Sequence, residues 1–97
     1  MRFEWDPAKN ESNIRKHRID FADIPSVFDG PMCVALDTSK EYGEDRWIGI
    51  GFLKAGIVLV VFVERDQETI RIVSARKAEK HEREEFQKEI GDRLGLS

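Results

Sequence analysis

The stretch IVLVVFV, residues 57–63, decides the fold that we predict for this chain. Seven consecutive apolar residues, most of them β-branched, are typical of a central strand that is buried on both faces of a sheet. Residues 54–56 (Lys-Ala-Gly) predict a three-residue hairpin connection back to a strand over residues 46–53, in which apolar residues alternate. On the other side, residues 65–68 predict a turn into a further strand over residues 69–75. The second half of the chain therefore predicts an antiparallel meander.

The first half of the chain predicts shorter elements. Aromatic and charged residues alternate over residues 2–5, which indicates a first strand. Asp6 followed by Pro7 is typical of a helix N-cap with proline at the first helical position, and predicts a helix to about Lys16. Residues 21–28 predict a short helix or turn that ends at the Asp-Gly-Pro sequence beginning at Asp29. Residues 32–36 predict an edge strand, and the polar stretch that follows, residues 38–45, predicts an exposed loop.

A last helix is predicted from about Ala78 to Ile90, with Gly91 as its C-terminal cap. Glutamates placed four residues before arginine or lysine support this helix, but its apolar stripe is thin, so we expect it to bury little against the sheet. Helices, an antiparallel meander and a terminal helix together predict the α+β class.

Length and composition predict one compact domain over residues 1–97, because 97 residues with 40% hydrophobic content can fill one small core. The longest apolar run has seven residues against the roughly 20 that a membrane helix needs, and the charged first residues do not favour a signal peptide. The single cysteine, Cys33, excludes an internal disulfide and favours a cytoplasmic setting. With only His17 and His81 beside it, we find no metal-ligand spacing and expect no metal or cofactor.

The charges are unevenly distributed along the chain. Its net charge is −3, but residues 20–45 hold seven acids and one base, so the rest of the chain holds 15 bases and 12 acids. Bases concentrate at Arg15–Arg18 and again at Arg71, Arg76 and Lys77. Such runs are commonly just solvated surface, although a locally positive face can also steer an anionic ligand toward an acidic protein.

The second basic concentration suggests a phosphate-binding surface. Arg71 alternates with Ile70 and Ile72, so we expect it on the face opposite the core, with Ser74 on the isoleucine side. Arg76 and Lys77 should follow at the strand-to-helix junction, beside the free N–H groups of the last helix, where anions bind well. Arg46 opens another strand of the same predicted sheet and completes this surface. Ser74 is a candidate for a hydrogen bond to substrate, with helix-end hydrogen bonding or a plain strand position as the alternatives.

His17 is the candidate proton carrier. Cleavage of an RNA phosphodiester without a metal needs removal of the 2′-OH proton, stabilisation of the charged phosphorane and protonation of the leaving 5′-oxygen. Imidazole suits both proton transfers, and arginine and lysine suit the phosphorane. The alternative for His17 is a helix C-terminal capping role. Tyr42 is expected in the exposed acidic loop, and His81 is expected to be solvated on a polar helix.

The order of these residues resembles a known family. The pattern Phe3-x-Trp5-Asp6-x-x-Lys9-x-x-x-Asn13-x-x-Lys16-His17-x-Ile19-x-Phe21 is similar to the opening signature of the BrnT toxins. The similarity continues through Val27-Phe28-Asp29, Glu44-x-Arg46 and Ile50-Gly51 to Ile70-Arg71-Ile72-Val73-Ser74-Ala75-Arg76-Lys77-Ala78 and Glu82-Arg83. Two multi-residue motifs in the same order make the resemblance specific over nearly the whole chain.

This resemblance implies a toxin of a bacterial type II toxin–antitoxin module with a RelE/ParE-like fold, a compact antiparallel sheet with flanking helices. It implies a metal-independent endoribonuclease that cleaves mRNA and arrests translation. It also implies a BrnA-like ribbon–helix–helix antitoxin as partner, with operator DNA bound only through the complex. The implied catalytic residues are His17, Arg46, Arg71 and Arg76, and the implied substrate-binding residues are Lys16, Ser74 and Lys77.

One departure from the family pattern concerns Phe86. Similar sequences often carry tyrosine near this position, and phenylalanine cannot exchange a proton. Either His17 or a lysine then carries the proton transfer, or this copy is weakly active. Two other functions remain open on the sequence: a non-enzymatic module that binds an antitoxin and acts as co-repressor, and a ParE-like gyrase inhibitor.

Overall fold

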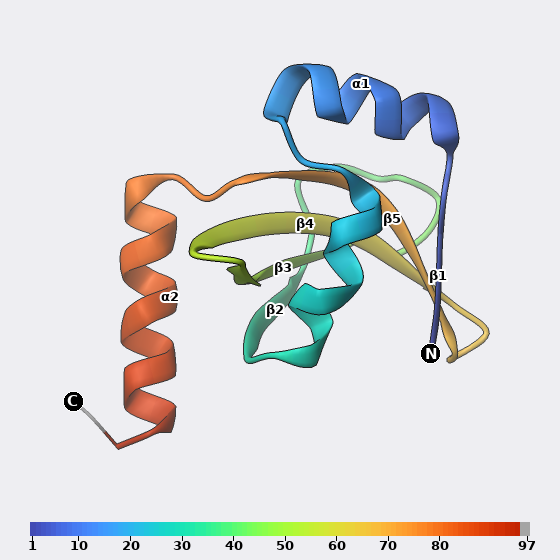
Figure 1. The fold of residues 1–97 in the computed structure, drawn as a ribbon. Coiled ribbons are helices and arrows are strands. Elements are labelled where there is room, and N and C mark those ends of the chain that lie inside the picture. The colour runs from blue at the N-terminus through green and yellow to red at the C-terminus, as the bar shows by residue number, and fades with distance from the viewer. Residues whose placement is uncertain (96–97) are drawn as a thin grey trace.

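The computed structural model describes residues 1–95 as one five-stranded sheet with flanking helices (Figure 1). The mixed α+β class predicted from the sequence is confirmed. The elements in chain order are β1 (Arg2–Trp5), α1 (Pro7–His17), the 3-10 helix η1 (Phe21–Asp29), β2 (Met32–Leu36), β3 (Trp47–Leu53), β4 (Gly56–Arg65), β5 (Thr69–Lys77) and α2 (Lys80–Arg93). Within residues 1–95, no helix is long and apolar enough to cross a membrane.

The sheet has the order β1-β5-β4-β3-β2, so the predicted meander of β3 to β5 is extended by the predicted edge strand β2 on one side and by β1 on the other. β1 runs parallel to β5, with Phe3 opposite Ile70, whereas every other pairing is antiparallel. β4 lies in the middle of the sheet and is buried on both faces over most of its length, as its unbroken apolar run predicts. The sheet therefore joins the first strand of the chain to the last.

Three predicted boundaries need correction. The β3–β4 hairpin has a two-residue turn, because Leu53 pairs with Gly56 and Lys54 adopts a positive φ of 55°. β5 runs on to Lys77, so the bases predicted at a strand-to-helix junction belong to the strand itself. α2 also continues through the predicted glycine cap to Arg93, whose guanidinium pairs with Glu89 at 3.3 Å and donates to the Met32 carbonyl at 2.8 Å.

A β-bulge changes the faces of β5. Val61 pairs with Ser74 and Phe62 pairs with Ile72, so Val73 is an extra residue without a partner on β4. Beyond the bulge the alternation is therefore shifted by one residue. The prediction that Ser74 shares the core side with the two isoleucines is wrong: Ala75 takes that side and is 1% exposed, while Ser74 turns to the other face.

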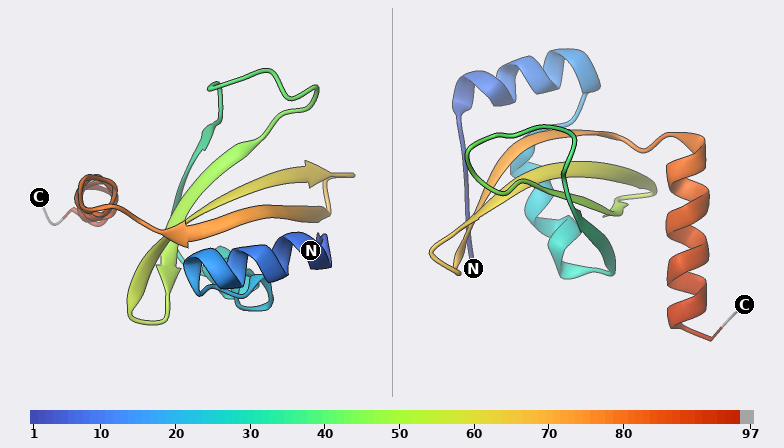
Figure 2. Two further views of the ribbon diagram at one scale, coloured as in Figure 1. Left: turned by 90° about the horizontal axis from the view of Figure 1, so that it is seen from above. Right: turned by 180° about the vertical axis from the view of Figure 1, so that it is seen from behind.

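One face of the sheet, which we call the η1 face, carries the main core. Phe21, Ile24 and Val27 of η1 are completely buried against it, and α1 lies on the same side (Figure 2, left). The packing is close enough to require glycine in β3. A Cβ at Gly51 would lie 2.7 Å from Cγ1 of the buried Val27, which has no room to move.

The opposite face, which we call the α2 face, is covered at one end by α2. Phe86 is the buried residue of that helix and packs with Ile57 and Ala78, and its ring meets that of Phe52 edge-on at 5.1 Å between centroids. The prediction that the last helix buries little is confirmed. The rest of this face lies between α2 and the loop over residues 37–46 (Figure 2, right).

Asn13 joins α1 to the sheet. Beyond the end of β1, its side chain takes the place of a neighbouring strand: Nδ2 donates to the Ala75 carbonyl at 2.9 Å and Oδ1 accepts from the Ala75 N–H at 3.1 Å. Nδ2 also donates to the Ile19 carbonyl at 3.0 Å. This buried side chain therefore fixes the end of α1 against the end of β5, across 62 residues of sequence.

Candidate active site

The ends of α1 and β5 form a basic hollow. It has a volume of about 290 Å³ and is lined by Lys16, His17, Arg18, Arg76, Lys77 and Glu79. Four of the seven site residues predicted from the sequence, Lys16, His17, Arg76 and Lys77, therefore line one cavity. The two basic concentrations, far apart in sequence, lie together in the fold.

Local structure explains how α1 delivers its residues. The basic last turn of α1 suits the negative end of the helix dipole. Arg18 then ends the helix in the left-handed conformation, with φ 60°, and its N–H donates to the Ile14 carbonyl at 2.9 Å. Because the chain reverses here and Ile19 enters the core, His17 and Arg18 stay at the surface beside the end of β5.

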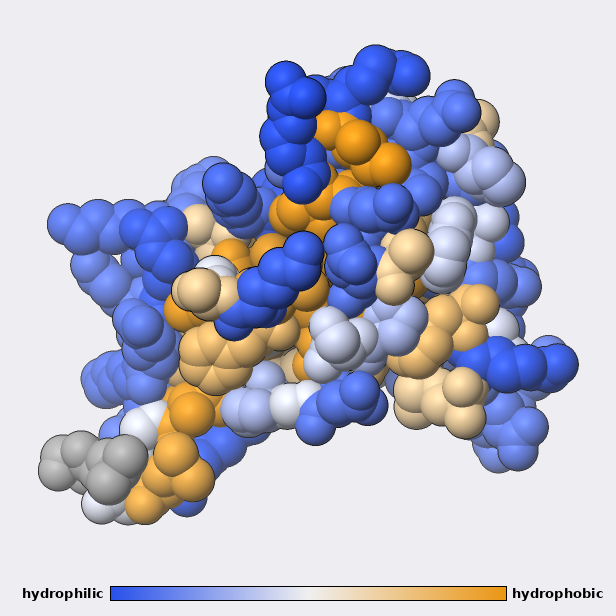
Figure 3. All heavy atoms as spheres, viewed as in Figure 1, coloured by the Kyte–Doolittle hydropathy of each residue, from blue (hydrophilic) through white to orange (hydrophobic). Residues whose placement is uncertain are grey.

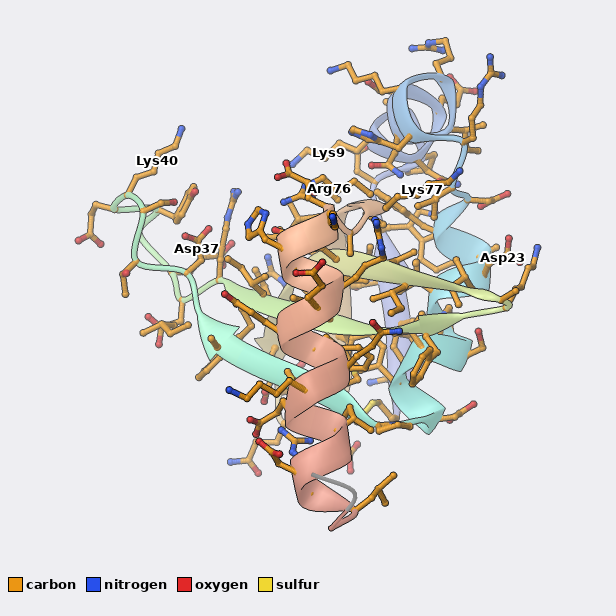
Figure 4. All side chains as sticks on the ribbon, turned by 90° about the vertical axis from the view of Figure 1, so that its left-hand side faces the viewer. Lys9, Asp23, Asp37, Lys40, Arg76 and Lys77 are labelled. Atoms are coloured by element: carbon orange, nitrogen blue, oxygen red, sulfur yellow. The ribbon has the colours of Figure 1, made fainter. Side chains whose placement is uncertain are left out.

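Arg76 is held by a carboxylate of α2. Its two terminal nitrogens donate to the two oxygens of Glu82 at 2.8 and 2.9 Å, a bidentate pair. Figure 4 shows Arg76 and Lys77 near the start of α2. The guanidinium lowers the pKa of Glu82 to about 2, and Glu82 in turn raises the pKa of Arg76. Glu82 also accepts from the Glu79 N–H at 2.7 Å, so the prediction that the helix N–H groups are free is wrong for that group.

Of the three other predicted residues, Arg71 and Ser74 lie on the α2 face. Residues 59, 61 and 63 of β4 share that face and pair with Arg76, Ser74 and Arg71, so these three side chains form a row along β5. The Arg71 guanidinium lies 3.6 Å from the Glu4 carboxylate, which also meets Arg65 at 3.5 Å. Arg76 belongs both to this row and to the basic hollow, and so connects them.

Arg46 is positioned by an aromatic ring that the sequence interpretation left aside. Its guanidinium carbon lies 4.0 Å from the centroid of the Tyr42 ring, a stacked cation–π contact. The Tyr42 hydroxyl donates to Asp37 at 3.2 Å, and Ser39 donates to the same carboxylate from its hydroxyl and its N–H. These hydrogen bonds lower the pKa of Asp37. Tyr42 is half-buried beside Arg46, within a loop that is otherwise exposed over residues 38–45, as predicted.

Glu79 is a site residue that the sequence did not single out. It lines the basic hollow and is its only carboxylate, with its Oε2 3.6 Å from Nδ1 of the exposed His81. Its position before the last helix gave no signal of this role, because the sequence does not show that α1 ends opposite it. The hollow thus offers an imidazole, a carboxylate and four cations around one cavity.

This set of groups matches the chemistry of phosphodiester cleavage. Imidazole and carboxylate can exchange protons, and guanidinium and ammonium groups can stabilise a phosphorane. In residues 1–95, no three His, Cys, Asp or Glu side chains gather as a metal ion would require. The hollow is open to solvent, which suits the phosphate group of a single strand of nucleic acid.

Comparisons with known proteins agree with this chemistry. A profile of the family described as "Ribonuclease toxin, BrnT, of type II toxin-antitoxin system" matches residues 5–82. Among solved structures, the crystal structure of the Brucella abortus ribonuclease toxin BrnT is similar, with 30% sequence identity and a TM-score of 0.65. That match covers 82% of this chain and 99% of the Brucella chain. A comparison with curated proteins found no match.

Proposed function

The chain belongs to the BrnT family of ribonuclease toxins of type II toxin–antitoxin systems, and from that premise we propose that it cleaves RNA at the basic hollow. The observation that supports the basic hollow as the active site is that one cavity is lined by Lys16, His17, Arg76 and Lys77. We carry over from the resemblance that the substrate is mRNA, that the fold is RelE-like and that the protein acts in the cytoplasm. The proposed partner is a BrnA-like ribbon–helix–helix antitoxin, through which the complex binds operator DNA.

The proposed reaction is an internal transfer at phosphorus. A base takes the proton of the 2′-OH, and the 2′-oxygen then forms a bond to phosphorus while the bond to the 5′-oxygen breaks. The leaving 5′-oxygen takes a proton from an acid, so the products are a 2′,3′-cyclic phosphate and a 5′-hydroxyl. His17 exchanges protons, with Glu79 as the second proton-exchanging group, and no metal is assigned to a step.

The cations stabilise the charge that develops on phosphorus. Arg76 is best placed for this role because Glu82 fixes its guanidinium and leaves it part-exposed at the hollow. Lys16 and Lys77 neutralise the phosphate from the two sides of the cavity. Arg71 and Ser74, which lie in the same row as Arg76 on the α2 face, then hold the neighbouring nucleotides, together with Arg46.

Purified protein and a labelled single-stranded RNA test this proposal. With EDTA present, the wild type is expected to release a cyclic phosphate end, and His17→Ala is expected to lower the cleavage rate by about 10²–10⁴-fold, the usual contribution of a general acid or base. Arg71→Ala is expected to weaken RNA binding more than the cleavage rate of bound RNA. Lys88→Ala, on the exposed side of α2, is the control.

The proposal fails if folded wild-type protein leaves RNA intact in vitro and during growth arrest in cells. DNA damage signalling with intact RNA would indicate gyrase inhibition, and operator repression without any toxicity would indicate a co-repressor module. Glu79→Gln separates the two proton-exchanging groups, because a rate unchanged by this variant leaves both transfers to His17.

A further inference from the structure

A second and larger cavity, which we call the hairpin pocket, adjoins the basic hollow. It has a volume of about 440 Å³ and lies between the end of α1, the start of η1, the β3–β4 hairpin and the start of α2. Its lining residues are Arg18, Ile19, Asp23, Leu53, Lys54, Ala55, Gly56, Ile57, Val58, Lys77, Ala78 and Arg83. Arg18 and Lys77 line both cavities, so a molecule bound in the pocket would lie at the rim of the hollow.

The floor of the hairpin pocket is apolar. Ile19, Ile57 and Val58 are each less than 9% exposed, and Leu53 is half-buried beside them. Figure 3 shows hydrophobic residues at the surface among hydrophilic ones on the face that α1, η1 and the hairpin share. An apolar floor offers nothing to a phosphate group, whereas it stabilises an apolar side chain by removing it from water.

The rim of the pocket is strongly basic. It carries the four cations Arg18, Lys54, Lys77 and Arg83 against one carboxylate, that of Asp23. Asp23 lies 4.0 Å from Lys54, and both side chains are well exposed, so this pair neutralises little. The Arg83 guanidinium donates to the Ala78 carbonyl at 2.8 Å, which fixes its direction and leaves its charge available.

Two of these cations occupy backbone positions that do not favour them. Arg18 and Lys54 have φ values of 60° and 55°, in the left-handed region where glycine and asparagine are preferred. A long basic side chain at both positions is therefore not explained by local backbone preference. Both positions border the same pocket.

We propose that the hairpin pocket binds an acidic, amphipathic segment of a partner protein. An apolar side chain of that segment packs on Ile19, Leu53 and Val58, which belong to one core cluster, and flanking carboxylates pair with Lys54 and Arg83 at the rim. The partner's identity as an antitoxin rests on the proposed function. Because Arg18 and Lys77 are shared between the two cavities, the bound segment lies over the edge of the basic hollow and blocks RNA from it.

Co-purification of the full chain with the antitoxin encoded beside it tests this assignment. The double variant Lys54→Glu/Arg83→Glu is expected to bind that antitoxin at least about tenfold more weakly, since like charges then face each other across the interface. The double variant Lys9→Glu/Lys88→Glu makes the same charge change on exposed helix surfaces away from the pocket and is expected to bind as the wild type. Cleavage of RNA by the free protein is measured in parallel and is expected to be unchanged in both.

A second variant tests the apolar floor without changing charge. Ala55→Trp at the exposed hairpin turn is expected to fill the pocket and to weaken antitoxin binding to a similar extent. Equal affinities of the pocket variants and the control would overturn the assignment. So would a loss of single-stranded RNA binding with antitoxin affinity retained, because the pocket would then belong to the RNA site. Antitoxin affinity is measured independently of RNA cleavage. A protein that binds the antitoxin but does not cleave RNA would therefore contradict the proposed function and not the assignment of the hairpin pocket.

Discussion

At the residue scale, Glu82 controls the geometry of Arg76. In the described part of the chain it is the only carboxylate that pairs with the Arg76 guanidinium, which also donates to the Lys77 carbonyl at 3.2 Å, and it accepts from the N–H of Glu79, the N-cap of α2. Glu82→Gln keeps the size of the side chain but removes its charge, and we expect it to lower the free energy of unfolding by about 1–3 kcal/mol at neutral pH. Chemical denaturation of the wild type and of Glu84→Gln, an exposed control on the same helix, measures the difference.

The same pair sets a dependence of stability on pH. The pKa of Glu82 is lowered from 4.5 to about 2 in the folded state, so its stabilisation is complete above pH 4.5 and is lost as the pH falls toward 2. The difference in unfolding free energy between the wild type and Glu82→Gln should therefore narrow over this interval. A difference that stays constant between neutral pH and about pH 2.5 would contradict the assigned pKa shift.

Asn13 is the second residue on which the site depends. Asn13→Ala leaves the N–H and carbonyl of Ala75 and the carbonyl of Ile19 without their partner, and we expect a loss of about 2–4 kcal/mol in unfolding free energy. Lys9→Ala on the exposed side of the same helix should cost less than about 0.5 kcal/mol. A cost for Asn13→Ala no larger than that of the control would show that α1 is held by other contacts.

Residue types alone predicted part of the candidate site. Lys16 and His17 were found because they lie in a basic run, and their neighbours in space on β5 were found for the same reason. Glu79 and the stacking of Arg46 on Tyr42 were not found, because both depend on how a loop or a helix end folds back over the sheet. No periodicity in the sequence records such a contact.

At the element scale, the bulge in β5 determines which face of the sheet Ser74 and Ala75 occupy, and substitutions at these two positions test it. Ala75→Leu places a large side chain in the buried η1 face, and we expect it to lower the unfolding free energy by about 1–3 kcal/mol through overpacking. Ser74→Val on the α2 face should change it by less than about 0.5 kcal/mol. Regular alternation of the strand, without the bulge, would give the opposite order in thermal unfolding measurements.

The elements themselves followed from local pattern, with instructive exceptions. Residues 57–63 predicted β4 because burial on both faces leaves an unbroken apolar run, and residues 69–75 predicted β5 because burial on one face leaves an alternation. The bulge was missed because Val73 is a good strand residue and gives no sign that it is unpaired. The parallel pairing of β1 with β5 was missed because alternation identifies the faces of a strand but not its neighbour.

At the scale of the whole molecule, the uneven charge distribution predicts how binding depends on salt. Three phosphate contacts from the basic hollow give a slope of about −2 for log affinity against log salt on a single strand. Lys16→Ala and Lys77→Ala should each reduce the magnitude of that slope by about 0.7. Fluorescence anisotropy with a 2′-deoxy strand, which cannot be cleaved, measures it over a series of KCl concentrations.

Glu41→Gln, in the exposed acidic loop, is the matched control and should leave the slope unchanged. A slope that responds equally to all three variants would mean that the net charge of the molecule, and not the basic hollow, governs the encounter with nucleic acid.

The pairing of the first strand with the last also sets an order of events during folding. β3, β4 and β5 are joined by turns of two and three residues, and the loop over residues 37–46 joins β2 to β3, so β2 to β5 can pair as successive hairpins. In contrast, β1 and α1 must close a loop that spans most of the chain. Before that closure, β5 can already hold the row of Arg71, Ser74 and Arg76 in place, while His17 on α1 is not yet beside it. The amide protons of α1 should therefore exchange with solvent through a partial opening that spares the meander, and each such opening would separate Lys16 and His17 from Arg76 and Lys77.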